Sequence, residues 1–388
     1  MQDFILEENK RLKEKFLWRN ICSLEKSLCH EIFLNGKKYI NFSSNDYLGY
    51  AHHPEVIKKA KEALTRYGSG GRSSRLISGT IELHNRLELK LAQFKKTEKC
   101  LVFPTGFMAN LGVISSLLGQ GDAILMDRLN HASLIDAAHL AGCRIFIYDH
   151  SNVLSLEKVL ERTKSYKKRL VVTDSLFSMD GDLAPLKEIV ELCKKNKVWL
   201  MLDDAHATGI LGKNGIGAAE HFGLLGEIEI VMGTLSKALG SQGGFVCGSK
   251  DLISFLVNRA RAFIYTTALA PAACAAALQS LCLVEKEEWR RKRVLKLSFD
   301  FQKELEKRFS DSGNFRKQMS QIVPFIVGSA EKSLKLANAL KEKGIFAPAI
   351  RPPTVPKNES RLRFSITSEH KEGDLKKLAD CLEENLKQ

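Results

Sequence analysis

Two short apolar segments of the sequence each run directly into residues that can do chemistry. Leu200–Leu202 is followed by an Asp-Asp-Ala-His sequence that contains Asp203 and His206, and Ile230–Met232 is followed closely by Lys237. In open α/β sheets, ligands bind at the carboxyl ends of the strands. If both segments are neighbouring strands, a carboxylate, an imidazole and an amine would face one ligand.

A carboxylate and a lysine placed in this way suit the chemistry of pyridoxal phosphate (PLP). The lysine can hold the cofactor's aldehyde as a Schiff base, and the acid can keep the pyridine nitrogen protonated so that the ring accepts electrons. An ordinary Asp–Lys ion pair would use the same residue types. The segment Pro104–Asn110 adds a glycine turn at the start of an expected helix, where free backbone N–H groups suit a phosphate. Together these features predict a PLP site with Lys237 as the Schiff-base lysine and Asp203 as the acid.

Further polar residues follow two more expected strands. Leu170–Thr173 leads to Ser175 and to Phe177–Asp182, and Ala123–Met126 leads to a segment that ends in Asn130 and His131. Because parallel strands end at the same edge of a sheet, these side chains are expected near the same ligand.

The elements that must position these residues alternate along the chain. Expected helices cover residues 81–95, 107–118, 133–141 and 185–196, and apolar runs cover 100–103, 123–126, 144–148, 170–173, 199–202 and 228–232. Runs this short and apolar are typical of strands buried on both faces. The alternation predicts an α/β fold with a mainly parallel sheet flanked by helices. Residues 243–247 follow the previous run after a short loop, so that strand is expected to be antiparallel.

The two ends of the sequence differ from this central pattern. Residues 1–30 are expected to form a helical arm, and residues 32–40 a hairpin that turns at Asn35-Gly36. After residue 285 a long charged helix (285–309), two β-like runs (322–327 and 361–366) and a final helix (372–386) predict a small α+β domain. The expected division is therefore 1–45 for arm and hairpin, 46–284 for the large PLP-binding domain, and 285–388 for the C-terminal domain.

Composition narrows the functional classes. The 388 residues include 59 Lys and Arg against 45 Asp and Glu, a net charge of +14. The basic runs lack interleaved aromatic residues, so nucleic-acid binding is not indicated. Residues 268–284 carry proline and polar residues and are expected to form a buried helix rather than a membrane span. Nine scattered cysteines without CxxC spacing favour reduced thiols in a cytoplasmic protein, with no metal site.

The order and spacing of many short motifs identify the chain as similar to a known family. It resembles the α-oxoamine synthases, PLP-dependent enzymes of fold type I (the aspartate-aminotransferase-like fold), from about residue 38 to the C-terminus. The matching segments are Asn45–Gly49, Gly68–Gly71, Ser74-Arg75, Gly79, His84, Leu87-Glu88, Gly106-Phe107, Ala109-Asn110, Asn130–Ser133, Phe177–Asp182, Asp203–His206, Thr234–Gly240 and Tyr265–Pro271.

The resemblance implies a role for each cofactor-binding residue. His131 stacks on the pyridine face and takes part in catalysis with Lys237, while Asp203, rather than Asp204, pairs with the ring nitrogen. The other cofactor contacts are assigned to the phosphate or the ring oxygen: Gly106, Phe107 and Thr234 to the phosphate, His206 and the adjacent Ser178 to the ring oxygen, and Thr267 to the phosphate of the neighbouring subunit. A homodimer with its active site between the subunits is therefore implied.

The resemblance also implies substrates. Asn45 and Arg363 would bind a substrate carboxylate, because a guanidinium can grip it with two parallel hydrogen bonds. Arg351 and Thr354 lie in Ala349–Pro356, which resembles members that condense L-alanine with a pimeloyl thioester in biotin synthesis. The donor would be pimeloyl-CoA or pimeloyl-acyl-carrier protein. The alternatives are a family member that uses glycine with acetyl- or succinyl-CoA and, in a different class, a catalytically silent or nucleic-acid-binding protein.

Three positions depart from the family pattern. Thr105 stands where Ser is common, Asp204 replaces a frequent Glu, and residues 23–27 replace an often arginine-rich stretch. The last change leaves the arm without an assigned substrate contact. An acidic carrier protein would fit the net charge, with the arm and the helix around 290–293 as candidate contact surfaces.

Overall fold

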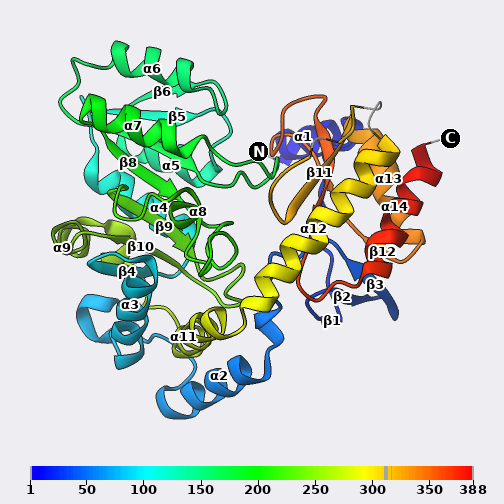
Figure 1. The fold of residues 1–388 in the computed structure, drawn as a ribbon, viewed down its shortest axis with the longest axis horizontal. Helices are drawn as coiled ribbons and strands as arrows, with labels where there is room; N and C mark the ends of the chain where they lie inside the picture. The colour runs from blue at the N-terminus through cyan, green and yellow to red at the C-terminus, as the bar shows by residue number, and fades with distance from the viewer. Residues whose placement is uncertain (1, 310–312, 316, 387–388) are drawn as a thin grey trace. The chain divides into compact units, whose positions relative to one another are not determined.

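The computed structural model describes residues 2–309, 313–315 and 317–386 (Figure 1). The chain forms two compact units. The small unit contains Met1–Tyr47, Met179–Asp182 and Lys292–Gln388, and the large unit contains Leu48–Ser178 and Leu183–Arg291. The N-terminal and C-terminal segments therefore belong to the same unit.

A seven-stranded sheet forms the centre of the large unit, in the order β4-β10-β9-β8-β7-β5-β6. The strands are β4 (Lys99–Phe103), β5 (Ala123–Asp127), β6 (Arg144–Tyr148), β7 (Arg169–Asp174), β8 (Trp199–Asp203), β9 (Ile230–Thr234) and β10 (Gly244–Gly248). The run from β9 to β6 is parallel, while β10 pairs antiparallel with both β9 and β4. Both the mainly parallel sheet and the antiparallel strand near residue 245 are confirmed.

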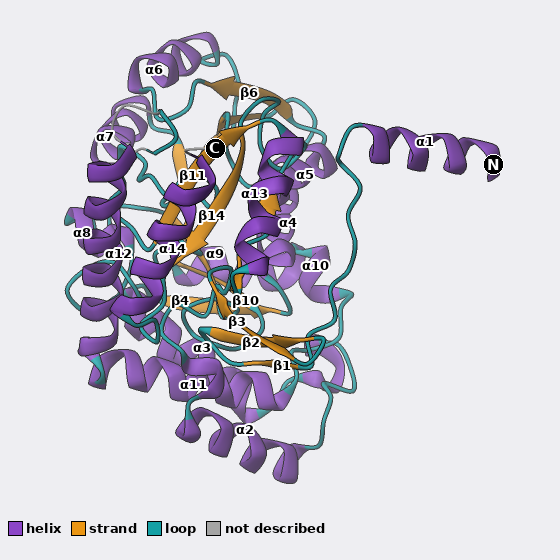
Figure 2. Ribbon diagram, turned by 90° about the vertical axis from the view of Figure 1, so that its right-hand side faces the viewer, coloured by secondary structure: helices purple, strands orange, loops and turns teal. Residues whose placement is uncertain are grey.

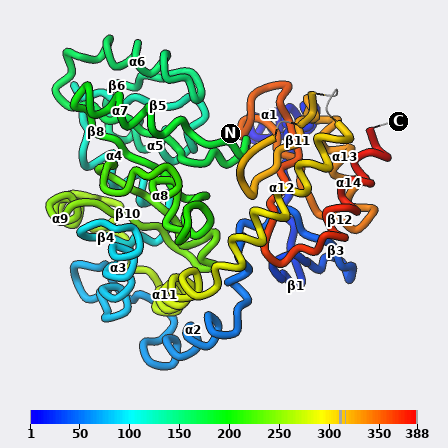
Figure 3. The backbone as a smooth tube through the Cα atoms, in the orientation of Figure 1, coloured from blue at the N-terminus to red at the C-terminus, as the bar shows by residue number. Residues whose placement is uncertain are grey.

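Helices alternate with these strands along the chain, as Figure 3 traces. They are α2 (Pro54–Tyr67), α3 (Glu82–Lys95), α4 (Gly106–Leu117), α5 (Ala132–Ala141), α6 (Val153–Arg162), α7 (Leu186–Asn196), α8 (Ala218–Phe222), α9 (Lys250–Arg259), α10 (Arg261–Ile264) and α11 (Pro271–Lys286). Buried apolar residues of α4, α5 and α9 pack on the sheet in one core cluster. The alanine-rich α11 is largely buried and contacts α2 and α3. Among the described helices, none is both long and apolar enough to span a membrane.

The edge strand β6 corrects one expectation. Residues 144–148 were expected to be buried on both faces, yet Arg144 is exposed and Ile147 is 58% exposed. The reason is topological: β6 pairs only with β5, so it lies at the edge of the sheet.

The small unit contains two short sheets. One has the order β1 (Lys26–Ser27), β2 (Glu31–Leu34), β3 (Lys37–Asn41) and β12 (Ile345–Phe346); the other has β11 (Ile322–Gly328), β14 (Ser360–Ser365) and β13 (Ala349–Ile350). The unit's helices are α1 (Gln2–Glu14), α12 (Glu288–Phe309, which begins in the large unit), α13 (Ala330–Glu342) and α14 (Glu372–Leu386). Helix α13 contacts β11, β14 and α14, all of which are labelled in Figure 2.

In the N-terminal segment the predicted hairpin is confirmed, and the helical arm is shorter than predicted. Strands β2 and β3 pair antiparallel around Asn35 and Gly36, whose φ angles of 51° and 69° suit a tight hairpin turn. The expected helix over residues 1–30 ends at Glu14, and Phe16 takes a left-handed φ of 57°. A non-glycine residue in that conformation cannot continue a right-handed helix.

Candidate active site

The ends of three parallel strands and the starts of two helices enclose a cavity of about 220 Å³ in the large unit. Its lining residues are Gly106, Phe107, Asn110, His131, Ser133, Asp174, Asp203, Ala205, His206, Met232, Thr234, Ser236 and Lys237. The structure therefore brings together seven of the cofactor residues expected from sequence. Ser178 and Thr267 are not part of the lining, and Thr267 instead forms a β-bridge with Ser74.

Asp203 ends β8 with its carboxylate in the cavity lining. It is 5% exposed, and its Oδ2 accepts a hydrogen bond of 2.9 Å from Asn110 Nδ2, while its Oδ1 accepts one of 3.0 Å from the Ala205 amide. Asp204 is absent from the lining and binds Lys95 instead. This opposite orientation is the expected result when an extended backbone continues by one residue.

The N-terminus of α4 provides donors at the other end of the cavity. Thr105 caps the helix: its Oγ1 accepts from the Met108 amide and its carbonyl accepts from the Ala109 amide, both at 3.1 Å. The first-turn amides of Gly106 and Phe107 have no intrahelical acceptor, and the described residues provide no other. A Cβ atom at Gly106 would lie 2.9 Å from Met232 Cε, the end of a flexible side chain, so a larger residue here would displace that methionine.

Thr234 lies beside that helix start, but its hydroxyl is already engaged. Its Oγ1 donates to the Gly243 carbonyl at 2.8 Å and accepts from the Ser236 amide at 3.1 Å. To donate to a phosphate, the hydroxyl would thus have to share its one proton between the phosphate and the Gly243 carbonyl, or rotate away from Gly243.

His131 caps α5 and orients its ring through Ser133. The Ser133 amide donates to Nδ1 at 3.2 Å and the Ser133 hydroxyl lies 2.8 Å from the same atom, so Nδ1 is an acceptor. Although His131 is exposed towards the cavity, the surrounding protein desolvates its ring and lowers its pKa; Lys237 acts in the same direction, while Asp203 opposes it. A neutral ring suits a group that stacks on an aromatic cofactor.

Asp174 is a cavity residue that the sequence analysis missed. It ends β7 next to Asp203 in the sheet register, and its Oδ2 accepts from Asn130 Nδ2 at 2.8 Å and from the His131 amide at 3.0 Å. Burial, with a smaller effect from Asp203, raises the pKa of Asp174 to about 8. Its position as the last residue of an apolar run was the available signal, because Asp203 stands in the same place on β8.

A second polar cluster surrounds Arg363 on β14 of the small unit. Arg363 is 8% exposed; its Nη1 donates to Ser365 Oγ at 2.6 Å and to Asn45 Oδ1 at 3.1 Å, and its Nη2 donates to Tyr47 Oη at 3.0 Å. The structure thus brings Asn45 and Arg363 together, although 318 positions separate them in the sequence. Burial raises the pKa of Tyr47, which therefore keeps its proton near neutral pH.

Arg351 lies in the same unit and is held by the arm. Its guanidinium donates to the carbonyls of Phe16 and Trp18, while Arg19 Nη2 donates to the Pro352 carbonyl at 3.0 Å. Burial and the nearby Arg19 lower the pKa of Arg351. The sequence analysis gave the arm no site residue, so Arg19 was missed; its proximity to Arg351 depends on a contact that spans 332 positions. Thr354 is exposed.

The cavity residues fit PLP in three respects. Lys237 supplies an amine, Asp203 supplies a buried carboxylate for a protonated ring nitrogen, and the start of α4 supplies N–H donors for a phosphate. In addition, Asn110 Oδ1 is buried in the lining without a hydrogen-bond partner, as expected for a group that faces a polar ligand.

Comparisons with known proteins agree with this geometry. The family described as aminotransferase class I and II matches residues 37–382. An 8-amino-7-oxononanoate synthase from Lysinibacillus sphaericus is 43% identical over 371 residues, 95% of this chain and 94% of that protein. Among solved structures, a serine palmitoyltransferase variant from S. paucimobilis with a bound PLP–myriocin aldimine has a TM-score of 0.92 at 31% identity, covering 99% of this chain and 97% of that chain.

An 8-amino-7-oxononanoate synthase structure from Francisella tularensis has a TM-score of 0.78 at 27% identity, covering 90% of this chain and 98% of that chain. These matches extend over nearly the whole sequence and agree on one fold and one cofactor. The chain therefore belongs to the aminotransferase class I and II family, among the 8-amino-7-oxononanoate synthases, and is a PLP-dependent enzyme of fold type I.

Proposed function

We propose that the protein condenses L-alanine with a pimeloyl thioester to give 8-amino-7-oxononanoate, carbon dioxide and the free thiol. A new bond joins the alanine Cα to the acyl carbon, the C–S bond breaks, and the alanine carboxyl group leaves as carbon dioxide. The observation that carries this proposal is the cavity that unites Lys237, Asp203 and the start of α4, in a chain similar over 95% of its length to a protein of that name.

PLP, when bound, supplies an electron sink that stabilises negative charge at the amino-acid Cα. The protein residues then have distinct tasks. Lys237 would hold the cofactor and, once its Nζ is free, would accept the Cα proton of the substrate. Asp203 would keep a proton on the ring nitrogen, and His131 would cover the face of the ring and exclude water from it.

The remaining proposed cofactor contacts secure the phosphate and the ring oxygen. The amides of Gly106 and Phe107 and the Thr234 hydroxyl would bind the phosphate, because helix N-termini favour anions. His206 would donate to the ring oxygen, with Ser178 beside it. Thr267, which is exposed, would bind the phosphate in the partner subunit's site.

The substrate carboxylates require cationic partners, and two arginines of the small unit are the candidates. We assign Arg363, held by Asn45 and Tyr47, to the carboxylate of L-alanine. Arg351 and Thr354 are assigned to the acyl substrate, whose far end carries a second carboxylate. Both assignments rest on guanidinium chemistry, since arginine binds a carboxylate in a planar fork.

The deciding experiment is a product assay by mass spectrometry. The purified enzyme with PLP is given L-alanine or glycine, each with pimeloyl-CoA, pimeloyl-acyl-carrier protein, acetyl-CoA or succinyl-CoA. The proposal requires 8-amino-7-oxononanoate from L-alanine and a pimeloyl donor. A ketone product formed only from glycine would instead establish the alternative reaction of the family.

We also propose a homodimer. Apolar side chains of the large unit are exposed on and near the segments that the resemblance places at a subunit boundary: Leu76 is 50% exposed, Ile77 80% and Tyr265 71%. Such exposure of large apolar residues is typical of a surface that another subunit covers. Sedimentation at assay concentration should give twice the chain mass, and a fully active monomer would contradict the proposal.

A further inference from the structure

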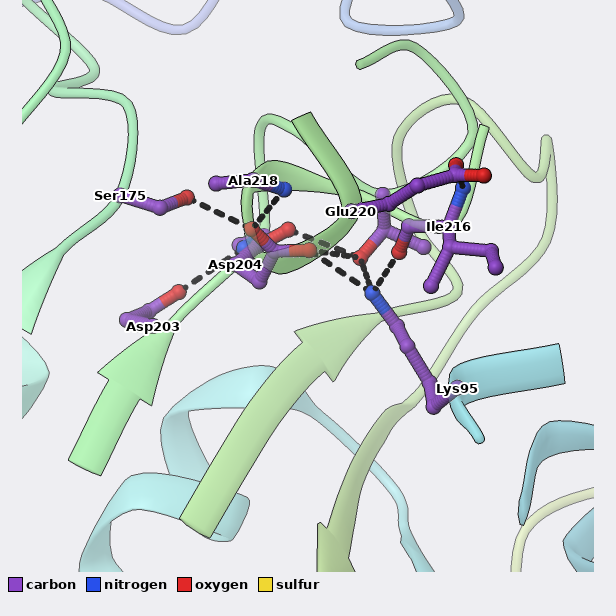
Figure 4. Close-up of polar contacts among 9 residues, drawn as sticks. Lys95, Ser175, Asp203, Asp204, Ile216, Ala218 and Glu220 are labelled. Atoms are coloured by element: carbon purple, nitrogen blue, oxygen red, sulfur yellow. Dashed lines mark hydrogen bonds and ion pairs between the residues drawn. The ribbon is translucent and has the colours of Figure 1, made fainter. Parts of the chain in front are cut away.

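A buried ion pair is formed by the residue that follows Asp203 in the sequence. Lys95, the last residue of α3, donates to Asp204 Oδ2 at 2.7 Å, and both side chains are 2% exposed (Figure 4). Asp204 follows Asp203 in the sequence but is absent from the cavity lining. The pair is therefore a charged site in the core with no direct access to the ligand.

Every polar atom of this pair is satisfied. Lys95 Nζ also donates to Thr208 Oγ1 at 2.8 Å and to the Ile216 carbonyl at 2.5 Å, which uses all three of its protons. Asp204 Oδ1 accepts from Ser175 Oγ at 2.7 Å and from the Ala218 amide at 3.1 Å. The pair thus joins the end of α3, the ends of β7 and β8, and the turn before α8 (Figure 4).

Stability alone does not account for such a pair. Removing two charges from water commonly costs as much as their attraction returns, and apolar residues of similar volume often stabilise a core equally well or better. What a fully bonded ion pair provides in addition is a fixed direction for each group. Gly217 shows how tightly that direction is set: a Cβ there would lie 1.8 Å from Asp204 Oδ2.

Because Asp203 and Asp204 are consecutive residues, the constraint on the Asp204 side chain also limits the orientation of Asp203. The Asp203 carbonyl accepts from the Ser175 amide at 2.8 Å, and the Asp204 amide donates to the Met232 carbonyl at 2.8 Å, so the single peptide group between Asp203 and Asp204 is held on both sides. Successive side chains of an extended segment point to opposite sides. Holding the Asp204 side chain on one side therefore limits the rotation that would turn Asp203 out of the cavity.

We propose that Lys95 is a positioning residue for the reaction, which acts through Asp204 to keep the Asp203 carboxylate aimed at the cofactor. This inference rests on the proposed role of Asp203 at the ring nitrogen. A second consequence is electrostatic: Lys95 balances the charge of Asp204, so that Asp203 does not share its peptide segment with an uncompensated carboxylate.

The test compares Lys95→Met and Asp204→Asn with Leu160→Ala, which removes apolar volume from a fully buried position on α6 away from the network. The two network variants should bind PLP about tenfold more weakly or worse, since hydrogen bonds to charged groups are sensitive to direction. The pH midpoint of the bound cofactor's absorbance should also shift, and kcat should fall more than the KM for L-alanine rises. Leu160→Ala should lower Tm while leaving the PLP dissociation constant and the absorbance titration unchanged.

A matched pair of glycines separates displacement of Asp204 from general damage. Gly217→Ala would press a methyl group against the Asp204 carboxylate, whereas Gly223→Ala, also at a positive φ in the α8 region, would meet nothing within 4 Å. Both substitutions strain the backbone, but only Gly217→Ala should also weaken PLP binding and shift the pH midpoint of the cofactor's absorbance. This pair decides the matter if Lys95→Met does not fold.

The proposal fails if the network variants and Gly217→Ala lose stability as Leu160→Ala and Gly223→Ala do, yet keep wild-type PLP affinity and absorbance titration. The ion pair would then be purely structural. Of these readouts, PLP affinity and the absorbance titration need no acyl donor. A wrong assignment of the acyl substrate would therefore leave them intact, and would appear only in the product assay.

Discussion

Buried carboxylates gather at the ends of β7 and β8 in the large unit, whereas buried arginines lie on β14 in the small unit. Asp174 and Asp203 are held by side-chain amides, from Asn130 and Asn110 respectively. On β14, Arg361 is 1% exposed and donates to Asp180 Oδ1 at 2.5 Å and to Glu359 Oε2 at 3.0 Å. The two regions therefore bury opposite charges.

The buried charged residues differ in the kind of side chain that contacts them. Arg361 is neutralised by carboxylates, as Asp204 is neutralised by Lys95. In contrast, neutral groups contact Asp203 and Arg363: Asn110 contacts the first, and Asn45, Tyr47 and Ser365 contact the second. A neutral partner fixes the direction of a charged group without cancelling its charge.

The largest expected effect concerns the cofactor cavity of the large unit. Lys237→Ala should reduce turnover by on the order of a thousandfold or more, because no other group of the cavity lining can form the covalent link. The absorbance of the lysine-bound cofactor should vanish as well. The exposed Lys194→Ala serves as the control and should keep both signals. Near-normal turnover of Lys237→Ala would remove the assignment.

The next effect concerns the arginine side. Arg363→Lys keeps the charge but loses the planar fork, and it should raise the KM for L-alanine by about 10- to 100-fold while PLP absorbance is retained. Arg293→Lys is the matched control in the same unit, because Arg293 donates to the carbonyls of Ser368 and His370. Steady-state kinetics with varied L-alanine check the result. An unchanged KM in Arg363→Lys would place the carboxylate site elsewhere.

The two regions also differ in how far the sequence revealed them. The cofactor cavity was largely predictable, since each apolar run ends in its functional residue and parallel strands bring those ends together. The arginine cluster was accessible only through family resemblance, because Asn45 and Arg363 meet across 318 positions. Asp174, Asn110 and Arg19 were missed for a similar reason: their significance lies in side-chain contacts that periodicity does not encode.

The length of the N-terminal helix was also overestimated from the sequence. Charged residues around spaced apolar ones continue past Glu14, which extended the predicted helical arm to residue 30, whereas the backbone turns at Phe16.

A smaller effect concerns the response of stability to acid at one buried histidine of the small unit. In the small unit, burial lowers the pKa of His370 to about 3, with His30 contributing; its Nδ1 accepts from the Thr367 amide at 3.0 Å. Between the ordinary pKa of 6.5 and this value, the unfolded chain binds a proton that the folded chain rejects. Stability from this group is therefore complete above pH 6.5 and is lost as the pH falls, by about 2 kcal/mol between pH 7 and 5.

His370→Asn should flatten that dependence while lowering stability at pH 8 by about 1 kcal/mol through a lost hydrogen bond. Urea unfolding from pH 8 to pH 5 measures both, with the exposed His52→Asn as the control. A His370→Asn protein as acid-sensitive as the wild type would show that other groups govern the response.

The smallest expected effect concerns the acyl donor and its candidate contact surfaces. The residues around 290–293 were considered as a basic contact surface, but Arg291 is 6% exposed and donates to the Val284 carbonyl. Arg290 donates to the Leu48 carbonyl at 2.9 Å, and Arg293 is held by carbonyls in the small unit. The guanidinium groups of Arg290 and Arg291 therefore serve the fold, whereas Lys292 and Arg293 are exposed. A groove of about 400 Å³ in the small unit also presents Lys37, Lys38 and Lys341 at its surface.

Charge complementarity makes that groove the better candidate for contact with an acidic acyl-carrier protein, because opposite charges accelerate encounter and salt screens them. Lys37→Glu with Lys341→Glu should lower kcat/KM for pimeloyl-acyl-carrier protein by about three- to tenfold at low salt, and the difference should disappear at high salt. Activity with pimeloyl-CoA should change less, since its small charged head needs few contacts.

The control is Lys158→Glu with Lys187→Glu, which gives the same net charge change on exposed residues of the large unit. If both double variants lose the same rate with the carrier protein, only net charge matters and the groove has no special part. If neither loses rate, or if pimeloyl-CoA is preferred at every salt concentration, steering of a carrier protein is excluded as a determinant of the donor.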